Sequence, residues 1–409
     1  MLRAKRLMSA AVLSGFFVSS LAFDLNMDST IGEDAGLIQI GPVSAYPSMK
    51  IVTLHDDNLF LSDKNELSTL VGIVSPAVKF SLQDNIKKLT LDYQIEAGFH
   101  ENSSQDDYVD QKLLGVFVFN PTDRIKTELR AEYLDEHDAR GTGRTEGFGA
   151  VGPDTTLDPD EWHSYSIGGL LSYGTPNATG RVEVESSYVT KEYDNNRLFT
   201  FDRDRNDFKL RGTFFYTIWP KTRLLFEIKQ TVFDYEKNAI GQASLDSTGR
   251  DYLFGVAWDA TYKTTGFAKF GLSEKDFDSD LRDDNDQFKW EIGVKWMPRS
   301  YSTVDITTVR RQDETNGIGD SIDVAEFKVS WNHLWRHRIS STVEFFFAED
   351  DFNSTRREDS RFMTSLKLNY DWRRWARISV GYQYEENDSN VSTFDYQRNL
   401  FGFAVNLTL

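Results

Sequence analysis

Histidine and carboxylate side chains are the residues of this 409-residue chain with the most obvious capacity for chemistry. Two of the six histidines, His100 and His137, stand among acids, as the members of a general acid–base pair do. No H-E-x-x-H, G-x-S-x-G or phosphate-binding-loop pattern accompanies them. We therefore expect that the protein is not an enzyme and has no catalytic residue; catalysis by His100, His137 and nearby acids is the alternative.

A run of aspartates between residues 276 and 286 superficially resembles a calcium-binding loop. Leu281 occupies the position that needs glycine, and Gln287 stands where a closing glutamate would bind the ion. Because the chain has no cysteine, thiolate metal sites and disulfides are excluded as well. The sequence predicts no metal site, no cofactor and a hydrated loop at this run.

Most charged side chains alternate with apolar ones, and this alternation indicates the elements that position them. In residues 88–99 the odd positions carry Leu, Tyr, Ile, Ala and Phe, while the even positions carry mostly Lys, Thr, Asp, Gln and Glu. A period of two is that of a β-strand with two unlike faces. From Met49 onward we count about 18 such segments, with 16 as the other possible number, each reading as one strand.

A closed β-barrel in a membrane explains why every strand has one apolar and one charged face. Lipid-facing and water-facing residues alternate along such strands, and a cation facing lipid at mid-depth would cost about 2–4 kcal/mol. No apolar run beyond the first residues reaches the roughly 18–20 residues of a membrane-spanning helix. We predict an all-β fold, a transmembrane antiparallel up-and-down β-barrel. In a soluble β-sandwich, the alternative, we would expect more apolar positions on both parities.

The charged rows must then line water or each other, which makes them the candidate pore-lining residues. At about 18 strands the interior is wide enough for an aqueous channel. The alternative is a lumen closed by its own salt bridges or by a folded-in loop, for which residues 138–161 are the best candidate. The pore-lining candidates are Lys88, Asp92, Glu96, Lys126, Glu128, Arg130, Glu132, Arg181, Glu183, Glu185, Lys209, Arg211, Glu227, Lys229, Lys289, Glu291, Lys295, Glu326, Lys328, Arg361 and Lys367.

The gaps between the predicted strands are short and long in turn. Short gaps, such as residues 120–123, 219–221 and 334–336, fall at tight turns, most of which carry Pro, Asn or Asp, and tryptophans cluster beside several of them as in an aromatic belt. In bacterial barrels the short turns face the periplasm and the long loops are extracellular. An even strand number then places both termini on the periplasmic side.

The first residues predict export from the cytoplasm. Residues 1–22 combine three cations, an apolar run and a small-x-small cleavage site ending at Ala22, as a signal peptide does. We expect residues 23–46 to form a periplasmic lead-in and residues 47–409 to form the barrel. The predicted location is the cell outer membrane of a Gram-negative bacterium.

The net charge of −18 makes nucleic acid an unfavourable partner. Acidic loops at a cell surface would instead meet outer-membrane lipid and lipopolysaccharide through divalent cations, or remain a solvated face without a specific ligand.

The start of the predicted barrel resembles that of a known family. Residues 47–60, with Asp56-Asp57-Asn58, are followed by Ser75-Pro76 in the second strand, and this opening is similar to that of the putative beta-barrel porin 2 family. The resemblance implies an outer-membrane barrel of exopolysaccharide or capsule operons that works with periplasmic polysaccharide-export proteins and a polysaccharide substrate. Such barrels usually end on Phe, which the barrel assembly machinery reads, whereas this chain ends on Leu409.

We therefore expect a porin-like channel that helps translocate an exopolysaccharide or capsular polysaccharide across the outer membrane. The alternative is a general or solute-selective diffusion porin for uptake, which should have a constricting loop folded inward and trimer-type contacts. The third possibility is an outer-membrane enzyme that uses His100 and His137.

Overall fold

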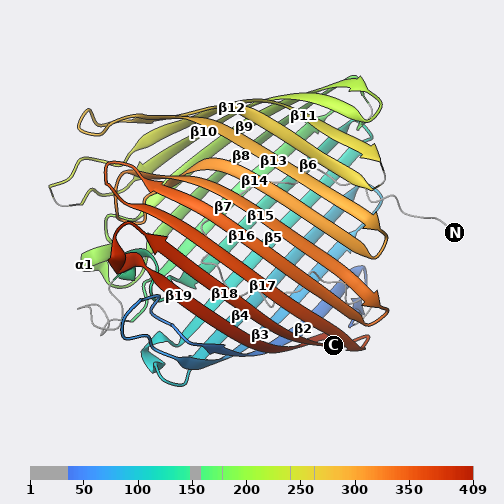
Figure 1. The fold of residues 1–409 in the computed structure, drawn as a ribbon. Coiled ribbons are helices and arrows are strands. Elements are labelled where there is room, and N and C mark those ends of the chain that lie inside the picture. The colour runs from blue at the N-terminus through green and yellow to red at the C-terminus, as the bar shows by residue number, and fades with distance from the viewer. Residues whose placement is uncertain (1–35, 148–157, 177, 240, 262, 409) are drawn as a thin grey trace.

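The computed structural model describes residues 36–147, 158–176, 178–239, 241–261 and 263–408. In these residues eighteen antiparallel strands close into a barrel, with one extra short strand (Figure 1). This confirms the predicted fold class. The strands are β1 (Ile38–Ile40), β2 (Val43–Asp56), β3 (Thr69–Gln83), β4 (Lys87–His100), β5 (Tyr108–Thr122), β6 (Ile125–His137), β7 (Glu161–Tyr173), β8 (Gly180–Tyr193), β9 (Arg205–Trp219), β10 (Thr222–Tyr235), β11 (Ser247–Thr261), β12 (Thr264–Phe277), β13 (Asn285–Arg299), β14 (Ser302–Glu314), β15 (Ser321–Arg336), β16 (Ile339–Phe352), β17 (Glu358–Arg373), β18 (Ala376–Ser389) and β19 (Tyr396–Thr408).

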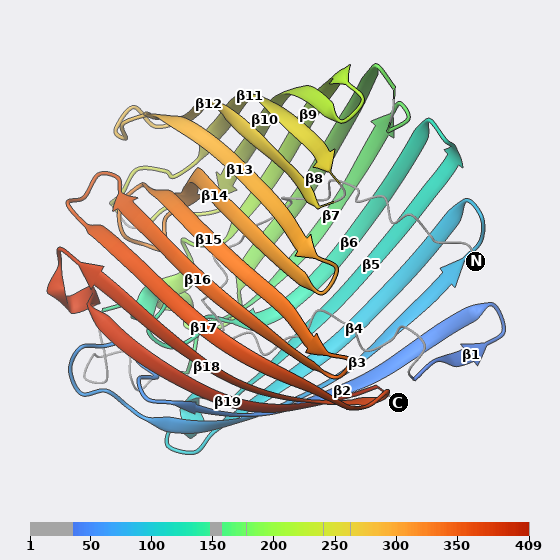
Figure 2. The same ribbon diagram turned by 45° about the vertical axis from the view of Figure 1, so that its right-hand side comes forward.

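The barrel closes by pairing its last wall strand with its first. Strand β19 pairs antiparallel with β2, from Leu400 opposite Asp56 to Thr408 opposite Ser48. Figures 1 and 2 show these two strands side by side. At the end of this seam nearest the long loops, the Arg398 guanidinium donates two hydrogen bonds to the buried Asp56 carboxylate, at 3.0 and 2.5 Å. Among the described wall strands, β2 to β19, closure leaves no free sheet edge, which a strand in lipid could not tolerate.

The barrel wall has its apolar face outside and its charged face inside, the reverse of the arrangement in a soluble protein. Apolar side chains such as Phe99, Ile167 and Phe254 are 55%, 65% and 57% exposed on the outside, while charged side chains such as Lys269 and Lys289 are buried inside. An apolar belt of this kind needs lipid around it. The part of the chain that the structure describes contains no helix long and apolar enough to cross a membrane.

Short turns lie at one end of the barrel and long loops at the other. Strand β19 ends at the short-turn end, and the helix α1 (Arg197–Thr200) lies among the long loops (Figure 1). The predicted turn at residues 334–336 is wrong by about two residues, since β15 continues to Arg336. The Leu334 amide donates to the Tyr301 carbonyl at 2.8 Å, and Trp335 Nε1 donates to Ser341 Oγ at 2.9 Å, so pairing extends past the expected turn.

Of the predicted signal peptide and periplasmic lead-in, only the last part of the lead-in belongs to the described residues. The predicted signal peptide, residues 1–22, lies outside the described residues, as do residues 23–35 of the predicted lead-in. The rest of the lead-in contains β1 and the first residues of β2, which begins at Val43 and pairs with β1.

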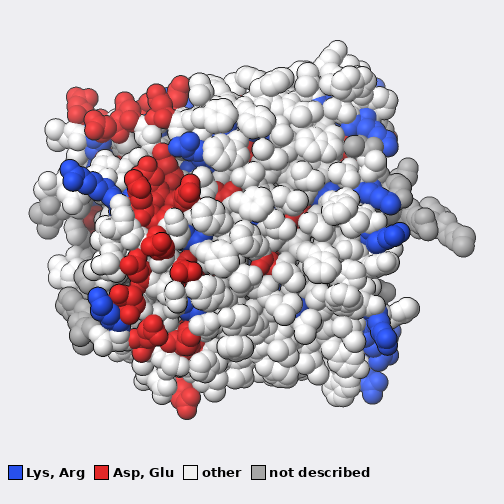
Figure 3. All heavy atoms as spheres, in the orientation of Figure 1, with Lys and Arg blue, Asp and Glu red and all other residues white. Residues whose placement is uncertain are grey.

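The two ends of the barrel differ in charge and in aromatic content. Figure 3 shows Asp and Glu gathered toward the long-loop end and Lys and Arg gathered at the short-turn rim. Trp219 lies exposed at the rim of the lumen, whereas Trp335, Trp372 and Trp375 lie exposed on the outer face beside short turns. This is where amphipathic indole rings are found in membrane proteins, at the level of the lipid headgroups.

Candidate functional site

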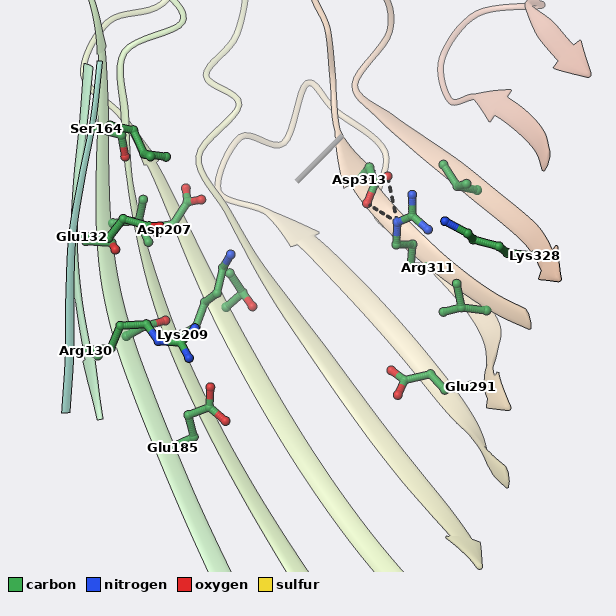
Figure 4. A pocket seen from close by; sticks show the side chains of 18 of the residues that line it. Arg130, Glu132, Ser164, Glu185, Asp207, Lys209, Glu291, Arg311, Asp313 and Lys328 are labelled. Carbon is green, nitrogen blue, oxygen red and sulfur yellow. Dashed lines mark hydrogen bonds and ion pairs between the residues drawn. The ribbon is translucent and has the colours of Figure 1, made fainter. Parts of the chain in front are cut away.

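A single large cavity of about 3350 Å³ occupies the barrel interior, and charged side chains line it. Figure 4 shows Arg130, Glu185 and Lys209 on one side of it, with Glu291 and Lys328 on the other. The predicted candidates that line this lumen are Glu96, Lys126, Glu128, Arg130, Glu132, Arg181, Glu183, Glu185, Lys209, Arg211, Glu227, Lys229, Lys289, Glu291, Lys328 and Arg361.

Five candidates do not border this cavity: Lys88, Asp92, Lys295, Glu326 and Lys367. Glu326 lies behind a lining residue, since Arg311 Nη1 donates to its carboxylate at 2.5 Å. Lys295 is paired with Asp305 at 3.4 Å. A role for any of the candidates in the passage of a solute stays a prediction.

The wall formed by β10 to β13 neutralises its own charges. Lys269 bonds both to Glu227, at 3.0 Å, and to Glu291. Lys289 Nζ donates to Asp251 Oδ2 at 2.7 Å. All five side chains are at most 13% exposed. These five charged groups bond to each other and offer little to a molecule in the lumen, whereas the Lys229 side chain of the same wall is 39% exposed.

The adjoining wall, formed by β5 to β9, includes two cations that stay accessible from the lumen. The Arg130 side chain is 43% exposed and 3.4 Å from Glu128, and the Lys112 side chain is 47% exposed and 2.8 Å from Glu132. Such loosely held pairs can exchange partners with water or with a passing solute, because exposed ion pairs gain little free energy from each other.

The loop between β6 and β7 reaches from this wall across the lumen. At its base, Trp162 Nε1 donates to Asp138 at 3.0 Å, and Arg144 pairs with Asp160 at 2.8 Å. At its far end, Glu146 accepts hydrogen bonds from Asn316, which lies between β14 and β15, and from Arg357, which lies between β16 and β17. Those strands are about half a barrel away from β6 and β7 in the sheet order.

The middle of this loop packs tightly on other loops of the mouth. Arg140 Nη2 donates to Asp106 Oδ1 at 2.7 Å, and the two side chains are only 2% and 3% exposed. Gly141 has φ +81°, and a Cβ there would lie 2.6 Å from the Phe60 carbonyl oxygen, so no other residue fits. We call residues 138–147 the crossing segment. The loop at residues 138–161, expected as the best plug or gate, thus crosses the lumen in the part that is described; residues 148–157 lie outside the described residues.

Arg357 holds the far end of the crossing segment. Its guanidinium donates to the Asp359 carboxylate, with Nε 3.0 Å from both oxygens, and it also bonds to Glu146. Its planar face lies 3.5 Å from the ring centre of Phe394 and 4.1 Å from that of Phe352. We call Arg357 with these partners the clamp. It combines ion pairs with aromatic stacking at a buried position, so it fixes the position of Glu146.

Acidification is expected to tighten this closure. Burial raises the pKa of the Glu146 carboxyl above its ordinary value of 4.5, and this effect outweighs the lowering by Arg357. The Asp359 carboxylate also raises this pKa, and Arg361 lowers it. The docked segment therefore binds a proton more strongly than a released one, and docking gains stability as pH falls from the raised pKa toward 4.5. We expect channel conductance to decline over that range in planar bilayers.

Glu146→Gln is the control for this pH effect, because its side chain is neutral at every pH while keeping hydrogen-bonding groups. The variant should lose the decline. Conductance that rises on acidification in the wild-type protein would contradict the assignment.

The histidines that we considered for catalysis lie together near the long-loop end. His137 Nδ1 is 2.9 Å from Asp110 Oδ1 and the ring stacks on Tyr108, with ring centres 4.1 Å apart. His100 lies 6.3 Å from the Tyr108 ring, and the Tyr108 hydroxyl donates to Glu96 at 3.0 Å. Within the described residues, no group of three or more His, Asp or Glu side chains is arranged to hold a metal ion.

Sequence reasoning missed several residues of the site. Arg140, Glu146 and Arg357 lie in loops, where no periodicity marks them. Lys112 and Lys269 lie on strands and line or close the lumen, and the same alternation that identified their neighbours would have identified them.

Comparison with known proteins gives one strong match. The sequence model of the family described as Putative beta-barrel porin 2 matches residues 33–409. No curated protein matches the chain.

Several solved structures are similar to this chain at low sequence identity. OccK3 (OpdO) of Pseudomonas aeruginosa is 11% identical, with 89% of this chain and 95% of that chain covered and a TM-score of 0.48. The copper transporter OprC is 10% identical, with coverages of 91% and 81% and a TM-score of 0.48. The FrpB iron transporter of Neisseria meningitidis is 9% identical with a TM-score of 0.48; the match covers 84% of this chain but only 63% of the FrpB chain.

Proposed function

This chain belongs to the putative beta-barrel porin 2 family, and from that premise we propose that it is a channel that helps translocate an exopolysaccharide or capsular polysaccharide across the outer membrane. In this proposal the short turns and both termini face the periplasm, and the long acidic loops face outward. Periplasmic polysaccharide-export proteins would deliver the polymer, while lipopolysaccharide and other outer-membrane lipid surround the barrel, which the barrel assembly machinery inserts.

The observation that carries the proposal is the mixed charge of the accessible wall. A neutral or anionic glycan that slides through a pore needs many weak hydrogen bonds and no single tight site. The exposed Arg130 and Lys112, beside Glu128 and Glu132, offer such contacts over neighbouring strands. A lumen lined by charges of a single sign would retain a polymer of the opposite charge or repel a polymer of the same charge.

The direct test is secretion in a strain deleted for this gene. Polysaccharide is quantified in the culture supernatant and in the periplasm, with the wild-type gene and an Arg130→Gln/Arg211→Gln variant as complements. We expect polymer to be lost outside and to accumulate inside in the deletion strain, and to be partly restored by the variant. Normal secretion without the gene would refute the export role.

The crossing segment favours a second candidate, a diffusion porin for the uptake of small solutes. A loop folded over the lumen and fixed at Glu146 narrows the passage, as a size filter requires. Reconstituted vesicles discriminate the two functions: rapid entry of small sugars, together with unchanged polymer secretion in the deletion strain, would establish the porin.

Ion selectivity should depend on the accessible wall rather than on the buried one. Arg130→Gln/Lys112→Gln removes two exposed cations from the lumen, so we expect the reversal potential in a salt gradient to move toward cation selectivity. Thr231→Ser, on the buried wall, changes no charge and is the control for substitution as such; it should leave the reversal potential unchanged. An unchanged reversal potential in the double variant would show that ions take another path.

A further inference from the structure

Three neighbouring short turns carry an unusual concentration of arginine. The turns join β13 to β14, β15 to β16 and β17 to β18, so they follow one another around the rim. Figure 3 shows Lys and Arg at this rim on the face formed by the C-terminal strands. We call the following exposed residues the arginine arc: Arg299, Arg336, Arg338, Arg373 and Arg374.

The positive charge of the arginine arc is not balanced by the protein. Among the described residues, no carboxylate oxygen lies within 4.0 Å of any of its guanidinium nitrogens. Asp371, the acid nearest in sequence, is bonded to Arg377 instead.

Aromatic side chains mark the depth of the arginine arc in the membrane. Trp335, Trp372 and Trp375 are exposed beside it on the outer face. The rings of Trp372 and Trp375 are 6.1 Å apart, and the Arg373 guanidinium lies 5.6 Å from the Trp372 ring. Because exposed tryptophans of a barrel lie at the lipid interface, the arginines beside them lie at the level of the headgroups.

We propose that the arginine arc binds the phosphodiester headgroups of anionic phospholipids in the leaflet at the short-turn end. The guanidinium fork matches two phosphate oxygens, and the adjacent indoles pack on the glycerol and the first part of the acyl chains. An acidic protein would complement the charge but not the lipid-facing tryptophans, so the aromatic neighbours favour a lipid. The inference rests on insertion of the barrel in a membrane and not on what passes through it.

Quenching of tryptophan fluorescence by brominated lipid tests the proposal with the full folded barrel. Phosphatidylcholine vesicles receive a fixed minor fraction of brominated phosphatidylglycerol, brominated cardiolipin or, as reference, brominated phosphatidylcholine. The test variant is Arg336→Gln/Arg338→Gln/Arg373→Gln/Arg374→Gln. The matched control removes the same number of cations from other short turns: Lys87→Gln/Arg124→Gln/Lys221→Gln/Lys263→Gln.

We expect the wild-type protein and the control to be quenched severalfold more by an anionic lipid than by the reference, and the test variant to show no preference. Stronger quenching by cardiolipin than by phosphatidylglycerol would assign the arc to a lipid with two phosphates; equal quenching would assign it to separate phosphodiesters. Equal quenching by all three lipids in the wild-type protein, or an equal loss in the control, would overturn the proposal. The wild-type preference should also collapse in concentrated salt, a test that needs no variant.

Discussion

Arg357→Gln is expected to open the channel. The substitution removes the clamp at the far end of the crossing segment and leaves the Glu146 and Asp359 carboxylates without their cation. Breaking a buried ion pair from one side typically costs about 3–5 kcal/mol, which corresponds to a shift of about 10²- to 10⁴-fold in the ratio of docked to released segment. Single-channel recordings should therefore show a larger conductance.

Arg356→Gln is the matched control, because Arg356 is the exposed neighbour in the same loop. Glu146→Ala provides an independent route to the same result, since it releases the segment while the bond between Arg357 and Asp359 remains. Because the chain has no cysteine, Arg130→Cys gives a single thiol in the lumen whose rate of labelling reports access. If conductance and labelling are the same in Arg357→Gln and in Arg356→Gln, the crossing segment is not the constriction.

Lys269→Met is expected to weaken the barrel more than it changes the flow of ions. It leaves the carboxylates of Glu227 and Glu291 facing each other in a dry part of the wall. We expect a loss of about 3–5 kcal/mol in the free energy of unfolding, measured by urea denaturation of the protein refolded in micelles. Arg130→Gln, at an exposed pair, should cost at most about 1 kcal/mol.

A compensated variant separates charge imbalance from loss of packing. Glu227→Leu/Lys269→Met/Glu291→Leu replaces the whole group with apolar side chains, an exchange that is often neutral for buried ion groups. We expect it to recover most of the stability lost in Lys269→Met. Equal unfolding of wild-type protein and Lys269→Met would show that the group contributes no stability.

The wall of the barrel could be predicted because its strands obey one local rule. Each of Leu89, Leu91 and Tyr93 faces outward and each of Lys88, Asp92 and Glu96 belongs to the other parity, so a short window of sequence identifies both faces. Strand ends were less predictable: the local composition of residues 334–336 suggests a turn, whereas pairing of Leu334 with Ser340 and of Arg336 with Ile339 keeps them in β15.

The state of each lumenal charge could not be predicted from parity. Lys289 and Arg130 have the same type of position in the sequence, but Lys289 is buried against Asp251 while the Arg130 side chain is 43% exposed. Lys289 and Asp251 are 38 residues apart and lie on β13 and β11, on either side of β12, so their meeting depends on the register of two strand pairs. The clamp between Glu146 and Arg357 spans 211 residues and joins two loops, beyond the reach of any periodic pattern.

The seam between β2 and β19 has a consequence for the order of assembly. Asp56 and Arg398, which form a hydrogen bond there, are 342 residues apart. Strand β2 therefore cannot pair with β19 until almost the whole chain is present. Until then its backbone groups remain an open template for wrong pairing, and contacts of such long range form slowly. At the proposed outer-membrane location, we therefore expect that the chain must be kept unfolded until insertion, and that a chain truncated before β19 is degraded rather than inserted.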